Sequence, residues 1–74
     1  MPSAHDTLAA VARSSYGKLV AFLSARTRDV AAAEDAVADA VRAALEAWPR
    51  DGVPDHPEAW LLTAARRGLI DAAR

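Results

Sequence analysis

The residues best suited to chemistry lie in the last third of the 74-residue chain. A loop with the sequence RDGVPDHP is fixed by one glycine and two prolines, and it leads into a segment that opens on an aromatic and apolar run. Arginines can hold phosphates and a tryptophan can stack on an unpaired base, so these residue types allow nucleic-acid binding. The candidate residues for this role are Arg50, Asp51, His56, Trp60, Arg66, Arg67 and Arg74.

Each of these features also has a purely structural explanation. The residue types favour a core position for Trp60 over a base-stacking surface, and they favour a core position for Trp48 more strongly. His56 is most simply a solvated turn residue, and the arginines are a solubilising surface. On residue types alone, an ordinary helical hairpin is slightly favoured over a nucleic-acid reader.

Covalent chemistry has little support in the sequence. Asp51 and Asp55 share the loop, but two carboxylates near a turn are usually turn formers. The chain has no cysteine, no Gly-x-Ser-x-Gly turn and no glycine-rich phosphate loop. His5 and His56 lie far apart and neither has a ligand at helical spacing. We therefore expect a protein that is not an enzyme, with no catalytic residue, no metal and no cofactor.

The elements that must position these residues are helices of one small domain. A chain of this length buries only about 60% of the surface that its unfolded form exposes. Hydrophobic residues make up 53% of the sequence, but many are alanines, which favour helix and bury little area. The predicted core residues are Leu8, Tyr16, Leu19, Phe22, Leu23, Val37, Val41, Leu45, Trp48, Trp60, Leu61, Leu62, Leu69 and Ile70.

Apolar residues at helical spacing predict two helices in the first fifty residues. The first runs from about Ala4 to Arg26, and Ser3 with Asp6 forms a capping box at its start. The second follows Asp29, a good N-cap residue. We expect the second helix to end at Pro49, because a proline lacks the backbone donor that a helix interior needs.

A third helix is predicted from about His56 to the end of the chain. Asp55 with Glu58 has the spacing of a second capping box, and Pro57 lies in the first turn, where its missing donor costs nothing. The sequence contains no strand pattern and no repeat. The prediction is therefore an all-α domain of three helices with short connections.

Charge is unevenly distributed along a chain whose net charge is −1. Residues 29–48 hold five acidic residues and one basic residue, whereas residues 1–28 hold one acidic and four basic residues. Such a separation marks either different partners on different faces or ordinary solvated surface. No signal peptide and no apolar run of about 20 residues is present, so we expect a cytoplasmic protein without a membrane span.

Several motifs in order resemble region 2 of bacterial sigma-70 factors, in particular the extracytoplasmic-function group. The segments that carry the resemblance are AEDAV from Ala33, WPRDGVPDHP from Trp48, AWLLTAAR from Ala59, Ile70-Asp71 and Arg74. The segments YGKLV from Tyr16 and TRDV from Thr27 also fit, so the resemblance covers nearly the whole chain.

This resemblance implies a three-helix sigma region 2 bundle that binds core RNA polymerase and recognises and melts the promoter minus-ten element. The loop from Arg50 to His56 would hold a flipped base, and Arg66, Arg67 and Arg74 would follow the single-stranded non-template strand. The surface that docks on the clamp helices of the largest polymerase subunit would consist of Glu34, Asp35, Asp39, Arg42 and Glu46.

Three positions depart from the family pattern. Many members have glutamine at Ala38, a large apolar residue at Val41, and at Arg67 an asparagine that helps to shape the base pocket. The family also continues into region 4, so the resemblance interprets residues 1–74 as a region 2 fragment. An anti-sigma factor or a C-terminal domain is then a further candidate partner. The rival interpretation is a small helical protein–protein interaction or dimerisation module without DNA binding, which needs neither the loop nor the arginines.

Overall fold

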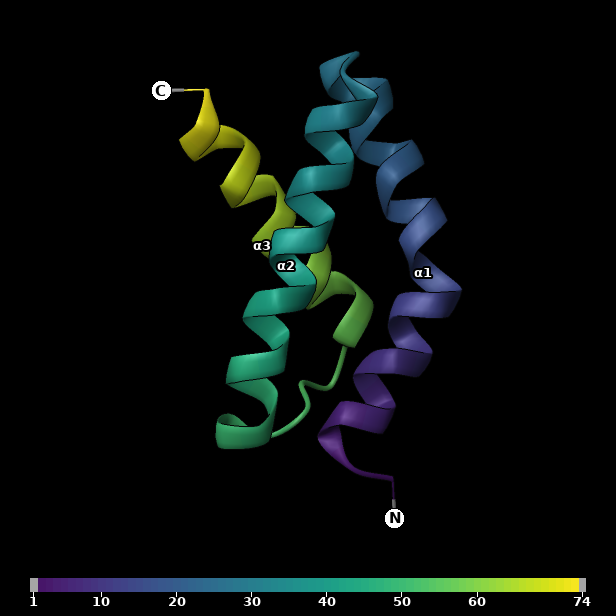
Figure 1. The fold of residues 1–74 in the computed structure, drawn as a ribbon, viewed down its shortest axis with the longest axis vertical. Coiled ribbons are helices and arrows are strands. Elements are labelled where there is room, and N and C mark those ends of the chain that lie inside the picture. The colour runs from purple at the N-terminus through teal and green to yellow at the C-terminus, as the bar shows by residue number, and fades with distance from the viewer. Residues whose placement is uncertain (1, 74) are drawn as a thin grey trace.

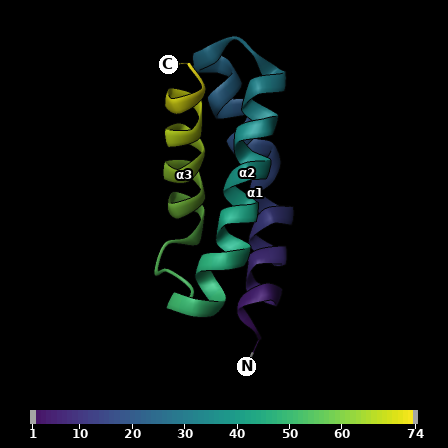
Figure 2. The same cartoon turned by 60° about the vertical axis from the view of Figure 1, so that its left-hand side comes forward.

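The computed structural model describes residues 2–73, and within them the chain forms three α-helices and no strand (Figure 1). These are α1 (Ala4–Thr27), α2 (Val30–Asp51) and α3 (Pro57–Ala72). The predicted all-α, three-helix fold is confirmed. Helix α2 runs antiparallel to both neighbours and packs on each of them, whereas α1 and α3 touch each other much less (Figure 2).

Local side-chain caps set the starts of α1 and α2, as predicted. The Ser3 Oγ accepts a hydrogen bond from the Asp6 N–H at 3.0 Å, and Asp6 accepts one from the Ser3 N–H at 3.4 Å. Asp29 caps α2 by accepting from the Ala32 N–H at 3.0 Å. Between the two helices Arg28 adopts the left-handed conformation, with φ 58°, which turns the chain. Each cap satisfies donors that the helix itself leaves free.

The predicted end of α2 at Pro49 is wrong, because the helix continues through Asp51. A proline removes the hydrogen bond of its own nitrogen and crowds the turn before it, but the residues after it can still donate to carbonyls upstream. The Gly52 N–H does so, bonding to the Trp48 carbonyl at 2.8 Å. The helix ends at Gly52, whose φ of 96° is incompatible with helix.

The predicted capping box between Asp55 and Glu58 is also wrong. The N-cap of α3 is His56, which makes no side-chain capping bond, although Pro57 occupies the first turn as expected. Glu58 instead accepts a hydrogen bond from Ser15 and lies 3.2 Å from the Lys18 Nζ, both on α1. Glu58 therefore pairs with side chains of another helix and not with the backbone before its own helix.

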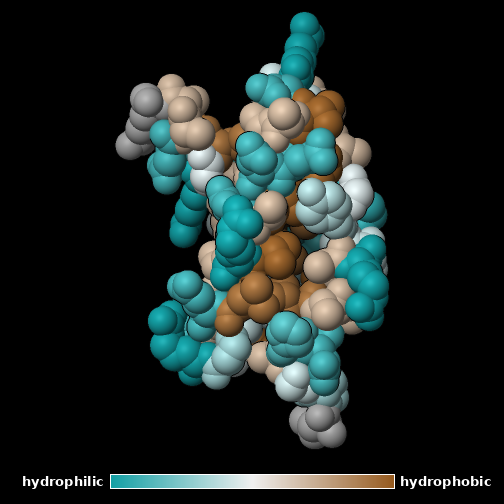
Figure 3. All heavy atoms as spheres, viewed as in Figure 1, coloured by the Kyte–Doolittle hydropathy of each residue, from teal (hydrophilic) through white to brown (hydrophobic). Residues whose placement is uncertain are grey.

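The core is a narrow stripe, and five of its eleven buried apolar residues are alanines. Val41, Trp60, Leu62 and Leu69 are only partly buried at its border. The buried apolar residues are Leu8, Leu19, Leu23, Ala33, Ala36, Val37, Ala40, Ala44, Trp48, Leu61 and Ala65. The predicted core residues that prove to be exposed are Tyr16, Phe22, Leu45 and Ile70. Apolar side chains also remain visible between charged ones on the face in Figure 3.

Two glycines should respond to alanine in opposite directions. Gly52 has a φ of 96° that side chains rarely adopt, whereas Gly17 lies inside α1 with open space where a Cβ would stand. We expect Gly52→Ala to lower the free energy of unfolding by about 1–3 kcal/mol. Gly17→Ala should raise it by up to about 1 kcal/mol. Urea unfolding of both variants measures this, and a change of the same sign in both would contradict it.

Candidate nucleic-acid interface

An open hollow of about 530 Å³ lies beside the start of α3. The preceding loop forms one wall, and one face of the first three turns of α3 forms the other. Its lining residues are Pro54, Asp55, His56, Ala59, Trp60, Thr63, Ala64 and Arg67. The helical members recur at three- and four-residue steps, which places them on one side of the helix. The hollow therefore combines an aromatic ring, a histidine, a carboxylate and a guanidinium.

A second hollow of about 210 Å³ continues along α3 and is lined by Thr63, Arg66, Arg67 and Ile70. Thr63 and Arg67 line both hollows. The two hollows therefore adjoin, and together we call them the α3 groove. The α3 groove begins at the loop before α3 and extends along the helix past Arg66. A flexible polyanion could lie along this surface, with its bases at one end and its phosphates near the arginines.

The two tryptophans have different roles in this region. Trp48 is 2% exposed, as predicted, and it is one of the largest fully buried side chains. Trp60 was also expected to be largely buried, but it is only partly buried and lines the groove. The two rings meet edge to face, with centroids 5.5 Å apart and an interplanar angle of 77°. Trp48 thus packs against Trp60 from the core, while Trp60 remains partly accessible in the groove.

Arg50 and Asp51 do not line the groove. Arg50 donates from its guanidinium to Asp51 at 3.0 and 3.1 Å, on the last turn of α2. This hydrogen bond raises the pKa of Arg50 and lowers the pKa of Asp51. Of the predicted DNA-binding residues, the structure brings together His56, Trp60, Arg66 and Arg67, while Arg74 lies outside the described residues.

Sequence reasoning missed the small and polar residues of the groove wall. Asp55 was assigned to a helix cap, and Thr63 was not considered. Thr63 lies four residues before Arg67 and three after Trp60, so helical spacing from these two would have found it. Pro54 carries no chemical signal in the sequence, because its contribution is the shape of the loop.

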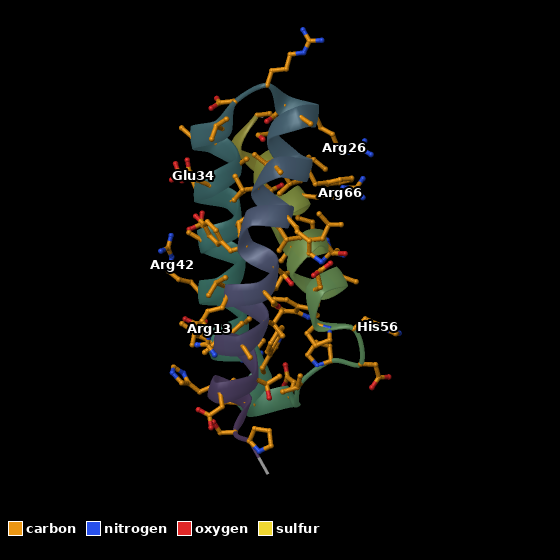
Figure 4. All side chains as sticks on the ribbon, turned by 90° about the vertical axis from the view of Figure 1, so that its right-hand side faces the viewer. Arg13, Arg26, Glu34, Arg42, His56 and Arg66 are labelled. Carbon is orange, nitrogen blue, oxygen red and sulfur yellow. The ribbon has the colours of Figure 1, made fainter. Side chains whose placement is uncertain are left out.

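The five residues predicted to dock on polymerase form a separate polar surface on α2, which we call the α2 face. All five are exposed, and Arg42 pairs with Asp39 within the helix. The members are Glu34, Asp35, Asp39, Arg42 and Glu46. Figure 4 shows Glu34 and Arg42 on one side of the molecule and His56 and Arg66 on the other. The α2 face and the α3 groove therefore lie on different sides of the molecule.

Two other kinds of site have no support in the part of the chain that the structure describes. Residues 2–73 contain no cluster of histidine, aspartate and glutamate side chains that could hold a metal ion. Within the same residues, no helix has the length and apolar character needed to cross a bilayer.

Comparison with protein families matches residues 11–74 to the family described as sigma-70 region 2. The matched range holds all of α2, the loop, α3 and most of α1. Neither the curated proteins nor the solved structures give a match.

Proposed function

Because the chain belongs to the sigma-70 region 2 family, a sigma-factor region involved in RNA polymerase binding and promoter recognition, we propose that it melts the promoter minus-ten element by capturing unpaired bases of the non-template strand in the α3 groove. The mechanism is binding without covalent chemistry. The protein works in the cytoplasm as a member of the extracytoplasmic-function group, an assignment supported by the WPRDGVPDHP and AWLL segments.

The observation that carries the proposal is the accessible part of Trp60 inside a groove that also holds Arg67. Unstacking a base costs a few kcal/mol. Stacking on an aromatic side chain returns about 1–3 kcal/mol per base, and only an unpaired base can reach the ring. A groove of this kind favours the open strand over the duplex, which is the energetic requirement for melting.

The α2 face serves the second partner. Its net negative charge suits a basic surface, and the family resemblance assigns it to the clamp helices of the largest polymerase subunit. Because the α2 face and the α3 groove lie on different sides, polymerase can hold the domain while the groove stays open to DNA. Complementary charge then contributes to the rate and orientation of docking.

Substitutions on the two faces should affect the two partners separately. Replacing Asp39 and Glu46 by lysine should weaken capture by core polymerase roughly tenfold, because two attractive charges become repulsive. The same variant should keep its helical content and its affinity for single-stranded DNA. Arg66→Ala is the matched control: it should lower affinity for single-stranded DNA and leave capture by core polymerase unchanged. Quantitative pull-down at moderate salt measures capture, and unaltered capture of the lysine variant would mean that polymerase docks elsewhere.

DNA binding needs a defined probe. The probe strand is the sequence that the 74-residue chain enriches from a randomised single-stranded DNA pool, and the control strand is its scrambled version. Affinity for each is measured by fluorescence anisotropy, and the ratio of the two affinities is the strand discrimination. Failure to enrich any sequence would refute the reading of base sequence in the α3 groove.

A further inference from the structure

Ser15, Lys18 and Glu58 form a polar contact between α1 and the first turn of α3. Ser15 is 2% exposed and donates its hydroxyl hydrogen to Glu58 Oε2, while the Lys18 Nζ lies 3.2 Å from the same oxygen. The hydrogen bond from Ser15 is the largest cause that lowers the pKa of Glu58, and the hydrogen bond from Lys18 is the second largest. Two donors on neighbouring positions of one helix therefore converge on one carboxylate of another.

Ser15 is the one buried polar residue among residues 2–73. A buried hydroxyl is stable only when it is hydrogen-bonded, because leaving it unpaired costs its desolvation free energy. Glu58 supplies that bond from the other helix. The pair thus links α1 to the first turn of α3 by a directional contact.

The start of α3 has few other restraints. His56 makes no side-chain capping bond, and residues 52–56 before the helix are not helical. Helices α1 and α3 share few contacts elsewhere. Glu58 lies between two groove residues, His56 and Trp60, so any movement of this turn would move the groove wall.

We propose that Ser15 is a positioning residue for the α3 groove, holding Glu58 and with it the turn that carries His56 and Trp60. Ser15 would not touch DNA. The consequence for strand discrimination rests on the proposed function, whereas the restraint on the turn does not.

Hydrogen exchange of the Trp60 amide reads the restraint directly, because its N–H bonds to the His56 carbonyl at 3.0 Å and closes the first turn of α3. Ser15→Ala should raise its exchange rate roughly three- to tenfold, the effect of losing one hydrogen bond. The Arg28 amide, which bonds to the Ser24 carbonyl at 2.7 Å at the far end of α1, should be unchanged.

Ser14→Ala is the matched control. Its hydroxyl is exposed and bonds to the Val11 carbonyl within α1, 3.2 Å away, so its loss should leave the Trp60 amide unaltered. Glu58→Ala should raise the exchange rate at least as much as Ser15→Ala, because it removes the partner of the buried Ser15 hydroxyl. Glu58→Gln should recover much of the protection, because its amide oxygen still accepts from Ser15 although it loses the charge that attracts Lys18.

Strand discrimination in the same variants completes the test. Ser15→Ala and Glu58→Ala should lower it roughly three- to tenfold, with Ser14→Ala and Glu58→Gln near wild type and polymerase capture unchanged in all four. Trp60 exchange that is equal in Ser15→Ala, Glu58→Ala and Ser14→Ala overturns the positioning role. Altered exchange with wild-type discrimination also overturns it and leaves the proposed function intact. Altered exchange in a chain whose wild type does not discriminate supports the positioning role and refutes the proposed function.

Discussion

Trp48→Ala is expected to abolish cooperative folding of the domain at 25 °C. Trp48 is 2% exposed and packs in a core whose other members are mostly leucine, valine and alanine. Truncating a buried tryptophan costs about 3–5 kcal/mol. A core of this size rarely supplies more than about 3–5 kcal/mol of net stability. The loss is therefore comparable to the whole free energy of unfolding.

Circular dichroism during thermal unfolding measures this effect, with Leu45→Ala as the control. Leu45 lies on the same helix but is 42% exposed, so its truncation should cost about 1 kcal/mol or less. A Trp48→Ala variant that melts cooperatively at the wild-type temperature would show that the core does not depend on this ring.

Arg67→Ala is expected to lower strand discrimination roughly tenfold, the second large effect. Arg67 lines the hollow that contains Trp60 and occupies the position where many family members have asparagine. If a base is held in that hollow as proposed, a side chain beside it contributes to sequence preference, and one good contact to a base edge contributes about 1–3 kcal/mol of discrimination. Arg66 lines only the second hollow, which does not include Trp60, so we expect it to contact phosphate.

Salt titration separates these two roles. Arg66→Ala should lower affinity for probe and scrambled strands alike and reduce the log–log salt slope by about 0.7, since phosphate contacts position the strand while base contacts specify it. Arg42→Ala is the control, because Arg42 belongs to the α2 face and lies on the other side of the molecule from Arg66 (Figure 4). If Arg67→Ala behaves like Arg66→Ala, Arg67 is a phosphate contact.

The three helices could be predicted because their signals are local. Ser3 and Asp29 cap helices by bonds to amides three residues away, and such pairs are visible in the sequence. Glu58 could not be assigned in this way, since its partner Ser15 is 43 positions distant. Tyr16 and Phe22 fit a helical stripe, yet they lie outside the narrow core, whose members on α1 are only Leu8, Leu19 and Leu23.

The site was predictable in part for the same reason. His56, Trp60 and Arg67 share a loop and the face of one helix, so their proximity follows from short spacing. Arg50 and Asp51 were expected beside them because Pro49 was expected to end α2. The helix instead continues past the proline, and these two residues pair with each other on its last turn. Asp55 was overlooked because its spacing to Glu58 assigned it to a helix cap, and the structure shows that this cap does not form.

The most direct test of base capture is one anisotropy titration of the wild-type chain with the probe strand, its scrambled version and the probe as duplex. The account predicts that the single probe strand binds at least roughly tenfold tighter than either competitor, and that His56→Ala flattens the preference between the two single strands. Equal binding of all three, with His56→Ala indistinguishable from wild type, would contradict base reading and favour a helical protein–protein interaction module.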